Sequence, residues 1–234
     1  MSQYCDEEQD NDKNAKKRTE TFKIESDSLL LVEGKDEVSF FKALLKKMDI
    51  KVKDEKSNEG VQIHDAGGCY KFPARFKLLV KDSGFSQVRK LGFVRDAEKN
   101  EAKSAFDSIC KVLKDTNALE RLPCNIGKVE EIGKLKVGIF IMPNNQDKGM
   151  LESLCLQSIK DMHCNKEMET YIECLKKHNE NNSSFNSEKA KTQVYLASKV
   201  PIVQSLGLGA CKGYFNFDDP IFDEIRSFLH NLFD

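Results

Sequence analysis

The chain has 234 residues, of which 39% are hydrophobic and 32% are charged, and its formal net charge at pH 7 is −1. This composition predicts one large domain, or one domain with an accessory piece. The near-zero charge argues against a protein that coats nucleic acid nonspecifically. No apolar run is long enough to cross a membrane and the eight cysteines form no CxxC pair, so we expect a cytoplasmic chain with reduced thiols and no membrane partner.

Residues 1–25 are polar and charged, with too few apolar residues to fold alone, so we expect a disordered tail there. A short apolar run over Leu29–Val32 ends at Glu33-Gly34, and the pattern then changes to helical spacing. This change predicts a buried strand followed by a helix. It places Glu33 at the carboxyl end of the strand, where ligands bind in open α/β sheets, and Glu37 in the first turn of the helix.

The alternation of strand and helix continues beyond this first unit. Apolar runs predict three more strands, and amphipathic spacing predicts helices between them. The strands cover Val61–Asp65, Leu91–Arg95 and Lys136–Met142, and the helices cover Phe72–Lys81 and Ala102–Leu113. Alternating strands and helices imply a mainly parallel sheet, here four-stranded and flanked by helices. The third strand delivers Asp96 and Glu98 to the sheet edge.

The rest of the chain is predicted to be helical. The expected helices span Gly149–Lys160, Glu167–Lys177, Glu188–Lys199 and Phe222–Phe233, and a Gly-rich stretch over Gly207–Gly213 separates the last two. Leu196, Val200 and Ile202 are expected to pack against the last helix. The predicted organisation is a tail over 1–25, an α/β domain over 26–160 and a helical extension over 161–234 that packs on the same domain.

Four carboxylates are predicted to meet at one edge of the sheet, because Glu33 and Glu37 follow the first strand and Asp96 and Glu98 follow the third. Their mutual repulsion is costly in one cleft unless a cation neutralises it. Oxygen ligands without nearby His or Cys suit Mg²⁺ or Mn²⁺. Acids in the first turn of a helix are also common caps, and surface carboxylates are mostly solvated, so both interpretations stay open.

Two motifs in this order resemble those of the TOPRIM fold. VEGKDEVSFF, which starts at Val32, is similar to the first motif, in which a strand ends in Glu-Gly and a helix opens with a second acid. LGFVRDAE, over Leu91–Glu98, is similar to the second, an apolar strand that ends in Asp-x-Asp, with Glu in the last place. The chain most resembles small uncharacterised TOPRIM-like proteins related to the OLD-type nucleases, through GMLESL (Gly149–Leu154), EKAKTQVYLAS (Glu188–Ser198) and the tail YFNFDDPIFDEIRSFL. The resemblance covers residues 27–232.

The resemblance implies metal-dependent, nuclease-like phosphodiester chemistry on nucleic acid, because the equivalent acids of the OLD-type nucleases bind two metal ions. The expected ligands of Mg²⁺ or Mn²⁺ are Glu33, Glu37, Asp96, Glu98 and Glu152. Glu33 and Asp96 are also the expected catalytic acids, and Glu33 has the alternative role of a general acid or base. Lys189 and Lys191 are expected to meet a transition-state phosphate, and solvated helix surface is the other interpretation of each.

Two features favour a rival function. Glu98 stands where the TOPRIM motif has Asp, and its longer side chain would shift a bound ion. Arg95 directly precedes Asp96, and its positive charge would compete with a metal for that acid. The rival is a catalytically degenerate TOPRIM-like module that binds a nucleotide or a protein partner. The near-neutral net charge also favours it.

Nucleic acid, either DNA or RNA, is expected to bind through a basic patch in residues 69–95. The patch contains Lys71, Arg75, Lys77, Lys81, Arg89, Lys90 and Arg95 against the single acid Asp82, and a solvated helix face is the other interpretation. The chain lacks the GxSxG, GxxxxGK[ST] and GxGxxG motifs, which argues against serine hydrolases, P-loop NTPases and dinucleotide-dependent dehydrogenases. Full OLD proteins carry an ATPase module, so an ATPase partner of this protein is expected to be a separate chain.

Overall fold

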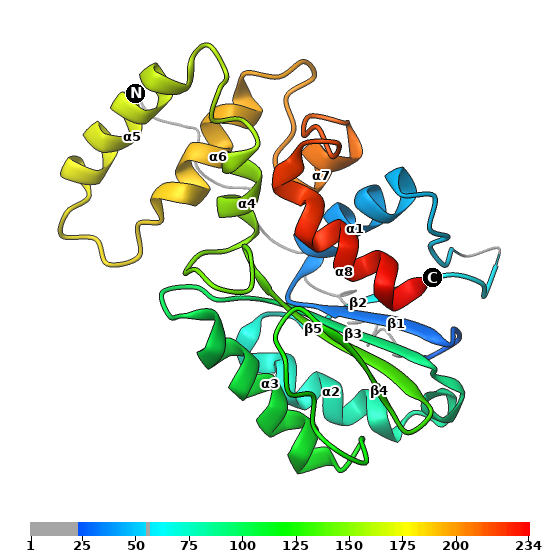
Figure 1. Cartoon of the computed structure of the whole chain (residues 1–234). Helices are drawn as coiled ribbons and strands as arrows, with labels where there is room; N and C mark the ends of the chain where they lie inside the picture. Colours follow the sequence, from blue (N-terminus) through cyan, green and yellow to red (C-terminus); the bar gives the residue numbers. More distant parts are fainter. Residues whose placement is uncertain (1–22, 55–56) are drawn as a thin grey trace, which may run out of the picture.

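Five strands form one mixed sheet at the centre of the protein (Figure 1), in a computed structural model that describes residues 23–54 and 57–234. The strands span Ser28–Val32 (β1), Gln62–Asp65 (β2), Lys90–Asp96 (β3), Val129–Ile132 (β4) and Leu135–Met142 (β5), and their order in the sheet is β2-β1-β3-β5-β4. β1 pairs in parallel with β2 and β3, and β3 pairs in parallel with β5. The α/β class and the four predicted strands are confirmed, and their carboxyl ends share one edge.

The predicted count of four strands was wrong, because β4 adds a fifth at the edge of the sheet. It runs antiparallel to β5, to which it connects through a tight turn where Gly133 has a φ of 60°. Edge strands often carry charged side chains, and β4 carries Glu130 and Glu131 in place of an apolar run. Glu130 forms an ion pair with Arg121, with 2.6 Å between Oε2 and Nη1. Apolar periodicity therefore does not reveal this strand.

Helices cover both faces of the sheet, which is the middle one of three layers (Figure 1). One face carries α2 (Phe72–Lys81) and α3 (Ala102–Thr116), and the other carries α1 (Lys35–Lys47) and α8 (Asp223–Phe233). Successive residues of β1 pack on opposite faces: Leu30 lies in the hydrophobic cluster that includes α1 and α8, and Leu31 in the cluster that includes α2 and α3. A strand buried on both sides needs a continuous apolar run, which explains the sequence of β1.

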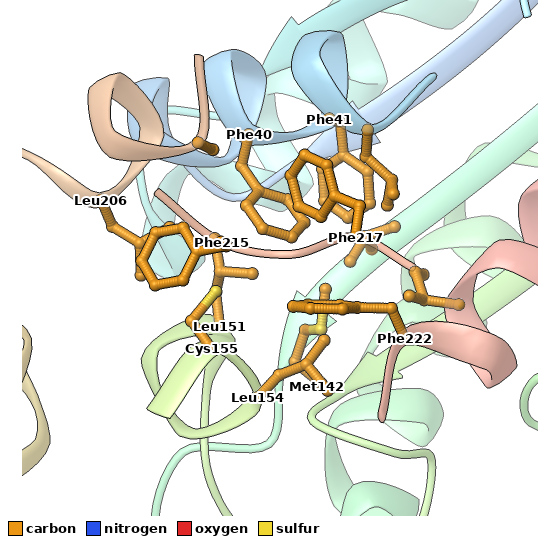
Figure 2. Packing of buried hydrophobic residues seen from close by; sticks show 14 of the residues in the cluster. Phe40, Phe41, Met142, Leu151, Leu154, Cys155, Leu206, Phe215, Phe217 and Phe222 are labelled. Atoms are coloured by element: carbon orange, nitrogen blue, oxygen red, sulfur yellow. The ribbon is translucent and has the colours of Figure 1, made fainter. Parts of the chain in front are cut away.

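A group of aromatic rings joins α1 to the C-terminal part of the chain (Figure 2). Phe40 makes edge-to-face contacts with Phe41 and with Phe217, and the ring centroids are 5.3 Å apart in each pair. Phe217 in turn packs edge-to-face on Phe222, at 5.4 Å. Pairs of this kind contribute about 0.5–1.5 kcal/mol beyond the area they bury. Residues from both predicted parts of the chain thus belong to one hydrophobic cluster, which holds α1 against the C-terminal part of the chain.

Four further helices gather beyond the carboxyl end of the sheet (Figure 1). They span Leu151–Gln157 (α4), Asn165–His178 (α5), Ser187–Ala197 (α6) and Leu206–Cys211 (α7). α7 corrects the expectation that the Gly-rich stretch Gly207–Gly213 only separates two helices. A Cβ at Gly207 would lie 2.4 Å from the carbonyl oxygen of Asp36 and 2.7 Å from Cβ of Ser39. Glycine therefore lets α7 pack closely against α1, rather than breaking the helix.

The other predicted helices are all present, and short 3₁₀ turns at Cys69–Lys71 (η1), Ser83–Gln87 (η2) and Pro220–Phe222 (η3) complete the fold. Val200 and Ile202 are exposed, so their predicted packing on α8 was wrong. The predicted tail over 1–25 lies outside the described residues up to residue 22, and Ile24 is buried. Within residues 23–54 and 57–234, no helix has both the length and the apolar character needed to cross a bilayer.

Candidate active site

Glu33 stands directly after β1, where the chain turns into α1. Its Oε2 atom accepts a hydrogen bond from the backbone amide of Asp96, at 3.5 Å, and the amide of Cys69 is a second donor to this carboxylate. Burial raises the pKa of Glu33 above its ordinary value, while the Arg95 guanidinium and the two amides act in the opposite direction. The side chain is half-buried, between β1, β3 and the loop that follows β2.

Asp96 is the last residue of β3, the strand beside β1. It is 9% exposed, and its Oδ1 atom accepts a hydrogen bond from the amide of Leu151 at the start of α4, at 3.1 Å. Burial raises the pKa of this carboxyl well above its ordinary value, and the negative charges of four glutamates raise it further. Those four residues are Glu33, Glu37, Glu152 and Glu98. Together with Asp96 they form what we call the acidic cluster.

Glu37 and Glu152 reach the acidic cluster from the first turns of α1 and α4. Both are half-buried, and burial is the main reason why the pKa of each is raised. The charges of Glu33 and Glu152 raise the pKa of Glu37 further. Gly34 leaves room for this carboxylate, because a Cβ at that position would lie 3.0 Å from Oε2 of Glu37. The Glu37 carboxylate therefore lies close to the glycine of the Glu-Gly pair.

Glu98 occupies a different kind of position from the other four acids. It is exposed, and its φ of 60° puts its backbone in the left-handed region. Its amide donates to the carbonyl of Gly149 at 2.8 Å, and the amide of Gly149 donates back to the Glu98 carbonyl at 2.9 Å. This pairing holds the segment before α4 against the end of β3 and so brings Leu151 and Glu152 to Asp96. The Glu98 backbone thus organises the site, while its side chain stays at the rim.

The structure brings one of the two predicted lysines to the acids. Lys189 on α6 has its Nζ atom 4.0 Å from Oε1 of Glu152, and its side chain is 60% exposed. Lys191 lies two residues further along α6 and pairs with Glu169 on α5, at 2.8 Å between Nζ and Oε1. Arg95 donates to Oγ of Ser108 on α3, at 2.9 Å. Lys189 therefore borders the acidic cluster, and Lys191 binds a partner elsewhere. Arg95 binds Ser108, and its charge also lowers the pKa of Glu33.

Two further acids, Asp36 and Glu188, act on the cluster, although neither is among the predicted site residues. The charge of Asp36 raises the pKa of both Glu37 and Glu152, and the charge of Glu188 raises that of Glu152. Asp36 accepts a hydrogen bond from the amide of Gly207 at 2.9 Å, and Glu188 accepts one from the hydroxyl of Ser153 at 2.6 Å. Asp36 sits in the VEGKDE segment and is recognisable as a nearby acid, but Glu188 arrives through the packing of α6 on α4 and has no local signal.

Residues 27–234 match the model of a protein family described as "Protein of unknown function (DUF3226)". The chain belongs to this family. Among solved structures, the crystal structure of hypothetical protein PH0156 from Pyrococcus horikoshii OT3 covers 88% of this chain and 94% of its own, at 18% identity and a TM-score of 0.54. That likeness concerns the fold alone. The C-terminal region of the Xanthomonas campestris pv. campestris OLD protein covers 89% and 82% at 16% identity, and its TM-score of 0.35 is too low to support an argument. No curated protein matches the chain.

In this DUF3226 protein the donor chemistry of the acidic cluster suits a hard divalent cation, because its side chains offer carboxylate oxygens only. Within the described part of the chain, no group of three or more His, Cys, Asp or Glu side chains is placed to hold a metal ion. Mg²⁺ commonly binds through one or two carboxylates and completes its sphere with water and substrate phosphate. Glu33 and Asp96, which meet across β1 and β3, fit that mode.

The basic patch predicted in residues 69–95 is divided between several environments. Lys90 donates to the carbonyl of Phe233 at the end of α8, and Arg89 donates to the carbonyls of Ser86 and Val88. The cations of this stretch that are exposed on η1 and α2 are Lys71, Lys77 and Lys81. They are separated from Arg95, which faces α3. A nucleic-acid interface in this region therefore stays a prediction that depends on the exposed lysines.

Proposed function

We propose that the acidic cluster binds Mg²⁺ or Mn²⁺ and that the protein cleaves phosphodiester bonds of nucleic acid in a metal-dependent reaction. The observation that carries this proposal is the environment of Asp96. The residue is 9% exposed, and its pKa is raised first by burial and then by the charges of four glutamates. Such an arrangement opposes ionisation in the protein alone, and a divalent cation removes the repulsion.

The resemblance to the TOPRIM fold supports the substrate class. The two motifs that carry it end at Glu33-Gly34 and at Asp96-Ala97-Glu98, and these are the segments that meet in the acidic cluster. In the OLD-type nucleases the equivalent acids serve phosphodiester hydrolysis. Glu33 and Asp96 are the proposed ligands, and Glu37 and Glu152 border them. When bound, the metal supplies Lewis-acid polarisation of the phosphate and charge stabilisation of the leaving oxygen.

The chain's own groups have separate parts in this proposal. The amide of Leu151 orients Asp96, and the amides of Asp96 and Cys69 orient Glu33, as outer hydrogen bonds orient the ligands of many metal sites. The raised pKa of Glu37 makes it a stronger general base than an ordinary glutamate. Lys189, exposed at the rim, offers a positive charge to a substrate phosphate.

The test is cleavage of supercoiled plasmid and of single-stranded DNA and RNA, with Mg²⁺, with Mn²⁺ and with EDTA. We expect cleavage that requires the metal and that Glu33→Ala and Asp96→Ala each reduce by about a hundredfold or more, the range found when one transition-state contact is removed. Glu131→Ala, an exposed acid on β4, is the matched control and should cleave like the wild type. Undiminished cleavage by both cluster variants would refute the assignment.

A noncatalytic TOPRIM-like module that holds a nucleotide or a partner chain is the second candidate function. Two observations favour it: Glu98 stands exposed where the motif has Asp, and no three acidic, His or Cys side chains in the described residues are placed to hold an ion. Calorimetric titration with Mg²⁺ and Mn²⁺ separates the candidates. Absence of binding up to millimolar metal supports the module, and binding that Asp96→Ala removes supports the enzyme.

A further inference from the structure

Tyr70 presents an aromatic ring to solvent beside the acidic cluster. It belongs to η1, the short turn after β2, and it is 97% exposed. The phenyl part of a tyrosine is hydrophobic, and an aromatic side chain with so little contact to its own protein contributes almost nothing to the core. Its stacking face is therefore available to another molecule.

The position of Tyr70 is tied to Glu33 by hydrogen bonds of the preceding residues. The amide of Gly68 donates to the carbonyl of Glu33 at 2.8 Å, and the amide of Cys69 donates to the Glu33 carboxylate. Gly67 and Gly68 have φ values of 77° and 100°, a region that glycine adopts without strain. The double glycine thus turns the chain from β2 towards Glu33, and Tyr70 directly follows the residue whose amide binds the Glu33 carboxylate.

Exposed lysines stand close to Tyr70 and to Glu33 along the chain. Lys71 follows Tyr70 directly and is exposed; its Cδ lies 3.3 Å from where a Cβ of Gly67 would be. The stem of Lys71 therefore runs back over the glycine turn, towards the carboxyl end of β2. Lys35, the first residue of α1, is also exposed and is two residues after Glu33.

We infer that Tyr70 stacks on an unpaired base of single-stranded nucleic acid, while Lys71 contacts the neighbouring phosphate, so that the strand's backbone passes Glu33. This inference rests on the proposed function and narrows its substrate to single strands or unpaired ends. A base in a duplex already stacks on its neighbours and offers no free face, whereas bases of a single strand stack on exposed aromatic rings whatever their sequence. A net charge of −1 gives the whole chain no general attraction for nucleic acid. The phosphate contacts must therefore come from local cations such as Lys71.

The first test is binding of oligothymidylate, measured by fluorescence anisotropy in EDTA so that no cleavage occurs. Tyr70→Ala should weaken binding about 5- to 150-fold, the range for loss of one base-stacking contact, and Tyr70→Phe should bind like the wild type. The matched control is Tyr171→Ala, whose residue is 52% exposed and lies on α5, a helix that contributes no residue to the acidic cluster. It should change nothing. The exposure of both rings predicts unaltered melting temperatures.

The second test uses the absence of tryptophan from the chain, which leaves five tyrosines as the fluorophores. Stacking should quench the emission of Tyr70 when the oligonucleotide binds. Tyr70→Phe should bind with the same affinity but lose that quenching, and Tyr171→Phe should retain both. Lys71→Ala should lower the salt dependence of binding by about one ion. Lys134→Ala, at an exposed lysine in the turn between β4 and β5, serves as its control.

The outcomes distinguish this inference from the proposed function. If metal-dependent cleavage occurs and needs Asp96, but Tyr70→Ala binds oligothymidylate as tightly as Tyr171→Ala, the proposed function stands and the stacking role is overturned. Failure of the wild type to bind any single strand overturns the stacking role as well. If single strands bind through Tyr70 and no variant or condition yields cleavage, the binding inference stands without the nuclease. Equal affinity for duplex and single strand contradicts the preference for unpaired bases.

Discussion

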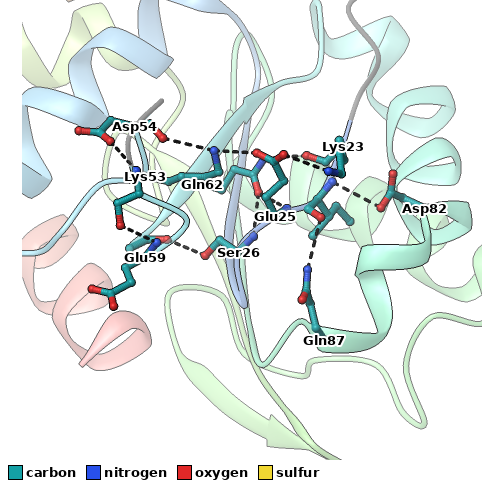
Figure 3. A network of polar contacts seen from close by, with 12 residues as sticks. Lys23, Glu25, Ser26, Lys53, Asp54, Glu59, Gln62, Asp82 and Gln87 are labelled. Atoms are coloured by element: carbon teal, nitrogen blue, oxygen red, sulfur yellow. Dashed lines mark hydrogen bonds and ion pairs between the residues drawn. The ribbon is translucent and has the colours of Figure 1, made fainter.

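Charged groups have opposite surroundings at the two ends of the parallel strands. At the amino end, where the chain enters β1, polar groups find partners in neighbouring segments (Figure 3). Glu25 pairs with Lys53 at 2.8 Å and with Lys23 at 3.3 Å, and hydrogen bonds from these lysines lower the pKa of Glu25. Gln62 of β2 accepts hydrogen bonds from the amides of Glu25 and Ser26, at 2.9 and 3.2 Å.

At the carboxyl end, acids gather mainly with other acids. The pKa values of Glu33, Glu37, Asp96 and Glu152 are all raised, in each case first by burial. Lys189 is the cation found beside Glu152, and it stands at 4.0 Å with most of its side chain in solvent. At the amino end the lysines favour the charged form of Glu25, while at the carboxyl end Arg95 and Lys189 do not outweigh the burial that raises the pKa values of Glu33 and Glu152. That contrast is the reason why we propose the functional site at the carboxyl end.

The largest effect expected from this contrast is stabilisation by metal. If the carboxyl end lacks a cation, saturating Mg²⁺ or Mn²⁺ should raise the free energy of unfolding, by about 2.7 kcal/mol at a concentration a hundred times the dissociation constant. Thermal unfolding with metal and with EDTA measures this. Asp96→Ala should abolish the gain and Glu131→Ala should keep it. If metal stabilised both variants equally, the ion would bind outside the acidic cluster. The difference between the two ends of the strands would then not reflect a metal site.

A second prediction concerns the protein without metal. Asp96→Asn should stabilise it at pH 7 by on the order of 1–3 kcal/mol, because the substitution removes a buried charge and the amide oxygen of the Asn side chain can still accept the hydrogen bond from Leu151. For a chain of this size the melting temperature should rise by about 2–4 °C per kcal/mol. The measurement is thermal unfolding in EDTA from pH 3 to pH 8.

The sign of its pH dependence follows from the raised pKa of Asp96. As pH rises from the ordinary value of 3.8, the unfolded chain loses this proton first, so the folded wild type loses stability until its own raised pKa is passed. The advantage of Asp96→Asn should therefore be absent below that ordinary value and full above the raised one. Asp107→Asn, an exposed acid paired with Lys103, is the control. An advantage that grows towards acid pH would contradict the direction of the shift.

Much of the fold can be predicted from local pattern, because four of its strands are apolar runs and most of its helices are amphipathic. The meeting of Glu33 and Asp96 also follows from sequence, since each residue ends a buried strand and parallel strands place such ends at one edge. β4 is not predicted, because Glu130 and Glu131 interrupt the apolar pattern by which a strand is recognised. α7 is not predicted, because glycine is usually a sign that a helix ends. Here Gly207 instead lets the helix pack closely against α1.

The surroundings of the acidic cluster are less accessible from sequence because they depend on tertiary packing. Glu188 lies near Glu152 because α6 packs on α4. Lys191 does not border the cluster, because it forms an ion pair with Glu169 on α5. Spacing on a helix shows that Lys189 and Lys191 differ in direction, but not which of them meets an acid. The exposure of Tyr70 likewise has no signal in the sequence. The two strand-end acids were therefore predictable, and their neighbours were not.

The smallest effect is expected at the amino end. Gln62→Ala removes two acceptor contacts and the bond that Nε2 donates to the carbonyl of Lys23 at 2.8 Å, and it should cost about 1 kcal/mol of unfolding free energy, typical of a polar contact near solvent. Gln87→Ala, which loses a single bond to the carbonyl of Ile24 at 3.3 Å, should cost less. Neither loss should vary between pH 5 and pH 8 or respond to metal, because glutamine does not titrate and these contacts lie at the opposite end of the strands. If the loss in Gln62→Ala were instead restored by Mn²⁺, the two ends of the sheet would be coupled, and the charges at the carboxyl end could no longer be treated as an independent site.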